Sequence, residues 1–177
     1  MPRKCSIQTA LLVLSTLYAF GCGGSVKTEI HAQKRAKSIQ TAYIVDNGYS
    51  TIVGYPYEPL PDIGMIIEGK KSQTASLGDT ANHIKRALQS HSVESTIGDN
   101  QSIPQNVDIV VRFEDEWQWD AKKYLRRLVI RFYDAKNGEK LVETTYHPKR
   151  MIIQTFPTPE KKVPGIIGSM IGQLSGS

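Results

Sequence analysis

Two stretches of alternating apolar and polar residues, 107–119 and 124–133, constrain the fold of this chain more than any other feature. Val111 and Phe113 recur at period two in the first stretch, and Ile130 and Phe132 do so in the second. This period is typical of half-buried β-strands, and residues directly opposite each other in an antiparallel pair share a face. The pattern therefore predicts an antiparallel hairpin that buries these four side chains together.

The polar positions of the two stretches support the same pairing. Glu114 and Glu116 alternate with the apolar face of the first stretch, and Arg127 and Arg131 alternate with that of the second. Burying the apolar positions therefore places the acids beside the arginines on the opposite face, where pairs of opposite charge stabilise a sheet.

Shorter elements are predicted around this hairpin. Alternation of apolar and polar residues indicates strands over 38–45, 92–97 and 141–146. Apolar residues spaced three and four apart indicate a helix from Asp79 or Thr80 to His91. The tail from Pro164 is predicted to form a short helix that packs on the sheet. The predicted fold class is α+β, with one small mixed or antiparallel sheet of about five strands, a C-terminal meander, and one or two helices on a face.

Residues 49–79 are predicted to form a long irregular loop with one short strand at 64–68. Prolines exclude a long helix there, and glycines interrupt the rest. Because such loops are often functional, Tyr49, Tyr55 and Tyr57 are candidates for a contact with a partner. Packing of these rings beneath the loop is the alternative.

A second aromatic group, Trp117, Trp119 and Tyr124, lies at the end of the predicted hairpin. These side chains either close one end of the core or serve as the amphipathic anchors found at protein interfaces. Because Asp115 interrupts the apolar face just before them, we expect Trp117 to be mostly buried and Trp119 to be more exposed.

Catalytic motifs are absent from the sequence. It contains no Gly-x-Ser-x-Gly, no phosphate-binding loop and no His-Glu-x-x-His, and its four histidines are scattered singly. The acidic cluster Glu114, Asp115, Glu116 and Asp120 is split between two strand faces and lacks the glycine-bent loop of a calcium site. We therefore expect a protein that is not an enzyme, with no catalytic residue, no cofactor and no metal.

The N-terminal segment has the features of a secretory signal. Arg3 and Lys4 precede an apolar run over 10–20, which is shorter than the roughly 20 residues of a spanning helix. The sequence Ala19-Phe20-Gly21-Cys22 resembles the lipobox of bacterial lipoproteins. This resemblance implies that residues 1–21 are a signal peptide, removed by cleavage before Cys22, and that Cys22 carries fatty acyl chains such as palmitate. An ordinary signal peptide with an incidental Cys22 is the alternative.

Residues 22–37, which follow the signal segment, indicate where the protein is located and which partners it has. Residues 22–37 lack an apolar stripe and are predicted to be a flexible tether, which leaves 38–177 as a single domain. In lipoproteins, Gly23 rather than Asp after the cysteine implies the outer membrane, with the domain in the periplasm. The net charge of +5 includes two basic residues of the signal, so it is too small to indicate a nucleic-acid partner.

The order of elements resembles that of small periplasmic lipoprotein domains related in topology to the TolB N-terminal domain, the CsgG group and activators of penicillin-binding proteins. The runs Trp117-Gln118-Trp119-Asp120 and Asp134-Ala135-Lys136-Asn137-Gly138 resemble a family of proteobacterial lipoproteins that has no assigned activity. The resemblance covers about residues 38–146 and implies no catalytic residues.

Three hypotheses for function follow. The first is a lipid-anchored periplasmic adaptor that presents a sheet edge or its Trp-rich end to an envelope protein. The second is a structural or secretion-assembly subunit that oligomerises at the outer membrane, and the third is a hydrolase of envelope material. A ring or discrete multimer in mild detergent favours the second hypothesis, and a monomer that crosslinks to one partner favours the first.

Overall fold

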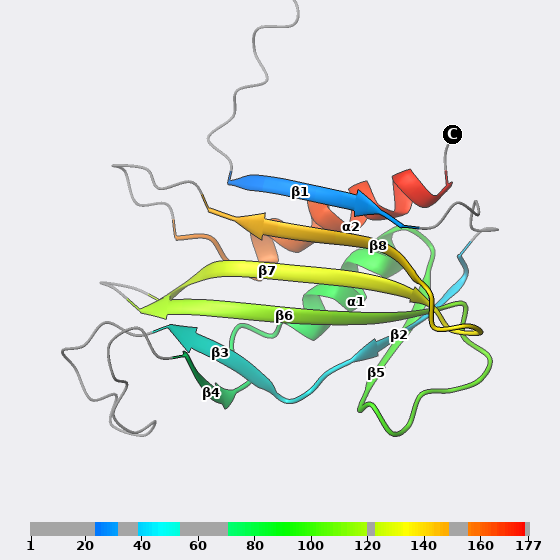
Figure 1. Cartoon of the computed structure of the whole chain (residues 1–177), viewed down its shortest axis with the longest axis horizontal. Helices are drawn as coiled ribbons and strands as arrows, with labels where there is room; N and C mark the ends of the chain where they lie inside the picture. The colour runs from blue at the N-terminus through cyan, green and yellow to red at the C-terminus, as the bar shows by residue number, and fades with distance from the viewer. Residues whose placement is uncertain (1–23, 32–38, 54–70, 120–122, 149–155, 176–177) are drawn as a thin grey trace, which may run out of the picture.

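The computed structural model describes residues 24–31, 39–53, 71–119, 123–148 and 156–175 (Figure 1). In these ranges the chain forms eight strands and two helices. In chain order they are β1 (Ser25–Ile30), β2 (Thr41–Val45), β3 (Tyr49–Val53), β4 (Lys71–Ala75), α1 (Thr80–Ser90), β5 (Glu94–Gly98), β6 (Ile109–Trp119), β7 (Lys123–Asp134), β8 (Lys140–His147) and α2 (Pro159–Ser175).

All eight strands belong to one mixed sheet with the order β1-β8-β7-β6-β2-β5. The strands β6, β7, β8 and β1 are antiparallel to their neighbours in this series, whereas β2 pairs in parallel with both β6 and β5. β3 also runs parallel to β6, further along the edge that β2 occupies, and β4 pairs with β3. The α+β class and the mixed sheet are therefore confirmed, but the sheet has more than the predicted five or so strands.

The extra strands lie where the sequence predicted irregular structure. β3 and β4 lie inside the predicted loop 49–79, and β1 lies inside the predicted tether 22–37. The tether prediction was wrong for Ser25–Ile30, because this segment pairs with β8 and packs beside α2 although it is too short and polar to show a strong pattern. The strand predicted at 64–68 lies outside the described residues.

The antiparallel β6–β7 hairpin is confirmed, and up to Glu116 its two faces carry the predicted side chains. Val111 pairs with Phe132, and Phe113 pairs with Ile130. Beyond this point the register shifts, because Glu116 pairs with Arg127 whereas Trp117 pairs with Leu125. Arg126 is therefore the extra residue of a β-bulge in β7.

The bulge corrects one prediction about the core. Unbroken alternation puts Tyr124 on the apolar face and Leu125 on the charged face. Instead Leu125 is fully buried in the main core and Tyr124 is half-buried. One inserted residue reverses the face of every position that follows it.

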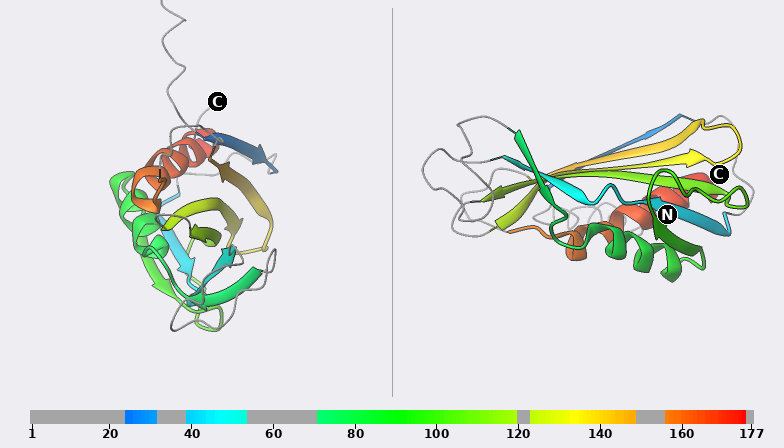
Figure 2. Two further views of the ribbon diagram at one scale, coloured as in Figure 1. Left: turned by 90° about the vertical axis from the view of Figure 1, so that its left-hand side faces the viewer. Right: turned by 90° about the horizontal axis from the view of Figure 1, so that it is seen from below.

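Both helices pack on the apolar face of the sheet (Figure 2). α1 buries Ile84 and Leu88, and it confirms the helix predicted from Asp79 or Thr80 to His91. α2 packs on α1 and β8, and it begins at Pro159 rather than at the predicted Pro164. Pro164 removes one helical hydrogen bond, but apolar residues of α2 are buried on both sides of it, so tertiary packing outweighs that loss.

On the opposite face of the sheet, described residues form an apolar cluster near the start of β6. Tyr43, Val45 and Val110 form a second, smaller core there, against partly buried side chains of the loop before β6 and of the β7–β8 turn. Towards the other end of β6 this face carries the charged residues of the hairpin, and no described helix covers them.

Trp117 is 3% exposed, which confirms that its side chain is mostly buried. Its ring packs against the backbone that leads into α1, at Gly78. Gly78 has φ = 70°, and a Cβ at this position would overlap the indole ring.

This contact makes Gly78→Ala a severe substitution, and Gly138→Ala is its matched control. Gly138 has φ = 72°, but a Cβ there would have no neighbouring atom within 4 Å, so alanine costs only the left-handed backbone penalty of about 1–2 kcal/mol. Gly78→Ala must also displace the indole, which adds roughly 1–3 kcal/mol. Denaturant unfolding of both variants measures the difference, and equal losses of stability would contradict the packing of Trp117 on Gly78.

Candidate interaction surface

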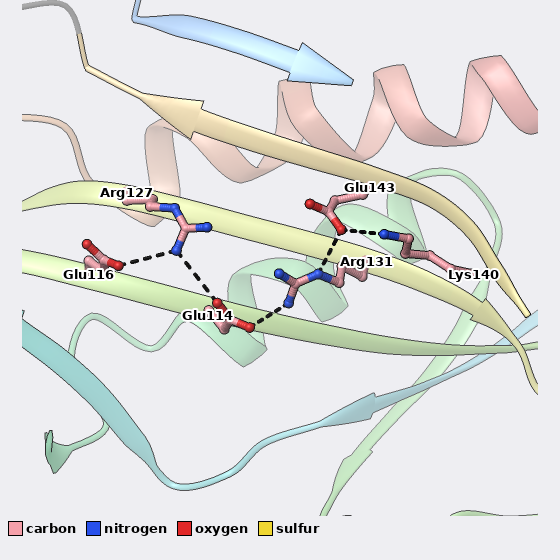
Figure 3. Close-up of polar contacts among 6 residues, drawn as sticks. All are labelled: Glu114, Glu116, Arg127, Arg131, Lys140 and Glu143. Atoms are coloured by element: carbon pink, nitrogen blue, oxygen red, sulfur yellow. Dashed lines mark hydrogen bonds and ion pairs between the residues drawn. The ribbon is translucent and has the colours of Figure 1, made fainter. Parts of the chain in front are cut away.

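A row of ion pairs lies across β6, β7 and β8 on the face of the sheet opposite the helices (Figure 3). Glu114 lies between two arginines, with its carboxylate oxygens 3.6 Å from Arg127 Nη1 and 2.6 Å from Arg131 Nη1. Arg127 Nη1 also lies 3.2 Å from Glu116 Oε1. The predicted placement of Glu114 and Glu116 beside Arg127 and Arg131 is therefore confirmed.

The row continues onto β8, which the sequence analysis did not foresee. Glu143 Oε2 accepts hydrogen bonds from Arg131 Nε and from Lys140 Nζ, each at 2.9 Å. The hydrogen bond from Lys140, followed by that from Arg131, holds the pKa of Glu143 below its usual range despite partial burial. The register of β7 with β8 places Glu143 directly opposite Arg131, and this pairing is what brings Glu143 into the row.

These six side chains balance one another. Three carboxylates face two guanidinium groups and one ammonium group, so the row has no net charge. Such a surface does not attract a polyanion by long-range electrostatics, and it suits a protein partner that offers both signs of charge. We call these residues, Glu114, Glu116, Arg127, Arg131, Lys140 and Glu143, the charged row.

A different polar group is buried beneath the helices. Asp115 is 3% exposed, and its Oδ2 accepts a hydrogen bond of 2.7 Å from Thr80 Oγ1 at the first residue of α1. Burial raises the pKa of the Asp115 carboxyl, although the hydrogen bond from Thr80 and the nearby polar groups of Trp117 and Ser50 oppose this effect. Among the described residues, the Trp117 indole N–H makes no hydrogen bond of ordinary geometry.

This buried group joins three elements that are far apart in the sequence. Ser50 of β3 accepts a hydrogen bond of 2.9 Å from the Leu77 N–H, just before α1, and Asp115 lies on β6. The carboxylate therefore ties the start of α1 to the sheet. The neighbours of the Asp115 carboxylate are the Thr80 hydroxyl at the start of α1 and the Trp117 indole. The role of this buried group is therefore structural: it fixes the start of α1 on the sheet.

The predicted contact aromatics are not brought together in the described part of the chain. Trp117 is in the core, which removes it from any contact surface of the folded domain. Tyr124 is half-buried and packs edge to face on Phe156, with ring centroids 5.9 Å apart. Tyr49 is 44% exposed at the start of β3. The Trp119 side chain, Tyr55 and Tyr57 lie outside what the structure describes.

One candidate surface was missed by the sequence analysis, namely the outer edge of β1. Val26 and Ile30 are 51% and 55% exposed there. With Thr28 they lie on the face that packs beside α2, since Val26 pairs with Tyr146 and Ile30 pairs with Val142. The alternation of Val26, Thr28 and Ile30 is the signal that could have identified this strand.

Comparisons with known proteins give a distant similarity. No protein-family model matches this chain, and no curated protein matches its sequence. Two solved structures of the PelC dodecamer from Paraburkholderia phytofirmans, one of them of a point variant, are similar at a TM-score of 0.44 and 12% sequence identity. In each case the match covers 85% of this chain and 94% of the PelC chain.

Neither described helix has the length and apolar character needed to cross a bilayer. No group of three or more histidine, cysteine, aspartate or glutamate side chains in the described ranges is placed to hold a metal ion.

The raised pKa of Asp115 predicts a specific pH dependence of stability. A carboxyl whose pKa is higher in the folded state than in the unfolded state stabilises the fold below the unfolded pKa, about 4, and this contribution is lost as the pH rises through the folded pKa. Asp115→Asn removes the titration. The unfolding free energy of this variant, relative to wild type, should therefore increase as the pH rises from about 3 to about 7.

Thr80→Val is the companion variant for this measurement. It removes a hydrogen bond that lowers the pKa of Asp115, so its stability should fall further than that of wild type as the pH rises. Urea unfolding at a series of pH values measures both differences. A relative stability of Asp115→Asn that stays constant or falls with rising pH would show that the carboxyl is not penalised by its burial.

Proposed function

We propose that this chain is a lipoprotein of the bacterial outer membrane, anchored through acylated Cys22, whose periplasmic domain binds an envelope protein without catalysing a reaction. The observation that supports this proposal best is the position of β1. This strand begins at Ser25, three residues after Cys22. Three residues span at most about 10 Å, so a lipid on Cys22 holds the edge of the sheet close to the bilayer.

The Trp-rich end of the hairpin lies at the same end of the sheet as the start of β1 (Figure 1). Val26 pairs with Tyr146, and Tyr146 pairs with Leu128. Lys123, at the start of β7, lies five residues beyond Leu128 towards the hairpin tip. A partner that contacts Trp119 or Tyr124 therefore meets the domain at its anchored end, and the charged row offers it a neutral polar surface alongside.

A subunit that oligomerises at the outer membrane is the second candidate function. The observation that favours it is the outer edge of β1, which presents backbone hydrogen-bonding groups and two exposed apolar side chains. Oligomerisation and partner binding use different parts of the sheet, so one chain can do both.

Acylation is tested by Cys22→Ala, with Cys5→Ala as the matched control. Cys22→Ala should abolish incorporation of radiolabelled palmitate and leave an uncleaved precursor or a water-soluble product, because the acceptor thiol is gone. Cys5→Ala should label normally, since Cys5 lies in the segment that is cleaved off. Full labelling of Cys22→Ala would refute the lipoprotein proposal.

Partner binding is tested by crosslinking in intact envelopes followed by affinity purification of the full chain. Wild type should enrich one envelope protein, and Trp119→Ala should weaken that complex by about 2 kcal/mol or more while costing about 1 kcal/mol or less of stability. Trp117→Ala is the control, and it should destabilise the domain by about 3–5 kcal/mol because its indole is buried. A complex that survives Trp119→Ala at full strength would move the contact to Tyr49, Tyr55 and Tyr57.

A further inference from the structure

The strand β1 has one paired edge and one open edge. All six of its residues pair with β8, and in the described ranges no strand lies on its other side (Figure 1). The exposed large hydrophobic residues of the described chain are Val26, Ile30 and Tyr49, so two of the three are on this one strand. An open edge that also exposes apolar side chains is a surface on which another strand can pair.

The direction of the backbone groups along β1 follows from one hydrogen bond. The His31 N–H donates to the Leu141 carbonyl at 2.9 Å, in continuation of the β1–β8 register. Because the groups of an antiparallel strand alternate in direction, the odd-numbered residues of β1 point their N–H and C=O towards β8. Val26, Thr28 and Ile30 therefore direct their backbone N–H and C=O groups outward, along the open edge.

We infer that β1 pairs with β1 of a second copy of this chain, antiparallel and centred on Thr28. In this register Thr28 lies opposite Thr28 of the partner subunit. Val26 lies opposite Ile30 of the partner subunit, so each exposed apolar side chain gains an apolar neighbour on the same face. Within one chain Lys27 already pairs with Glu29. In the dimer Lys27 also lies opposite Glu29 of the partner subunit, which gives two cross-strand contacts of opposite charge related by symmetry. The three outward-pointing residues of each strand meet as hydrogen-bonded pairs.

Charge selects this register from its neighbours. Backbone groups can also meet if the two strands are centred on Lys27 or on Glu29. The first alternative places Lys27 opposite Lys27 of the partner subunit, and the second places Glu29 opposite Glu29 of the partner subunit. Like charges directly opposite each other destabilise a sheet, so both alternatives are disfavoured. The other outer strands of the described sheet, β5 and β4, have one charged residue each, Glu94 and Lys71, and offer no such complementarity.

The symmetry of this pairing limits the assembly to two chains. Antiparallel pairing of identical strands is isologous, so each copy uses its whole β1 edge and leaves none for a third copy. The two Ser25 residues then lie at opposite ends of the paired strands, roughly 20 Å apart, and each is three residues from Cys22 of its own chain, so lipids on both chains can reach one bilayer. The inference does not depend on acylation, and a dimer of this kind is distinct from a ring of subunits.

Charge reversal tests the inference on the full chain in mild detergent, with sedimentation velocity as the measurement. Lys27→Glu places Glu opposite Glu29 of the partner subunit, and Glu29→Lys places Lys opposite Lys27 of the partner subunit. Each single variant should therefore raise the dimer dissociation constant by about tenfold or more. The double variant Lys27→Glu/Glu29→Lys restores opposite charges and should dimerise like wild type. A mixture of the two single variants should form a heterodimer.

Thr28→Pro tests the backbone part of the inference without altering charge. The N–H of Thr28 points to the open edge, so proline removes an intermolecular hydrogen bond and leaves the β1–β8 ladder intact. This variant should be monomeric, whereas Thr28→Val, which loses the same 3.0 Å contact with Thr144 Oγ1 but keeps the backbone N–H, should dimerise like wild type. A monomeric wild type, single charge variants that dimerise as tightly as wild type, or assemblies larger than two that Thr28→Pro leaves unchanged would each overturn the inference. None of these outcomes bears on acylation of Cys22, which the palmitate experiment decides separately.

Discussion

The antiparallel pairing of β6 with β7 is the constraint on which the rest of this structure depends. Because side chains alternate along a strand, one register fixes both faces of the sheet at once. The pairing of Phe113 with Ile130 forms part of the apolar face on which α1 and α2 pack, and the same register places Glu114 near Arg131 on the opposite face. The other edge of β6 also receives β2 and β3, so this one strand positions elements from most of the chain.

The apolar face of β6 contains one exception, and the surrounding structure accommodates it. Asp115 continues the alternation of Phe113 and Trp117, so its carboxyl points into the core. A buried carboxyl costs free energy unless it is hydrogen-bonded, and Thr80 supplies that bond from the first turn of α1. The helix start is thereby fixed to β6, next to the place where the Trp117 indole covers Gly78. A residue that looks like a defect in the strand pattern thus connects the sheet to its helix layer.

The sequence predicts the parts of this fold that have a long and regular pattern. The hairpin, α1 and the pairing of acids with arginines all follow from repeated spacings, and each is confirmed. The bulge at Arg126 is not predictable in this way, because a single inserted residue leaves the composition of the strand unchanged. β1 and β3 have only five or six residues each, and their partners β8 and β6 are more than sixty residues away along the chain. Short strands of this kind are defined by the sheet that accepts them, and propensity alone does not identify them.

The edge of the sheet shows why that missed strand matters for function. Proteins protect open edges with charged residues, since a charge on the edge penalises pairing with most other strands. In β1 the two charges are opposite in sign and placed symmetrically about Thr28, with Val26 and Ile30 outside them. Such an edge still disfavours pairing with strands of unmatched charge, but its charges are complementary to those of a second, antiparallel β1 strand. The same residues that prevent indiscriminate association therefore specify one partner, and that partner is another copy of the same strand.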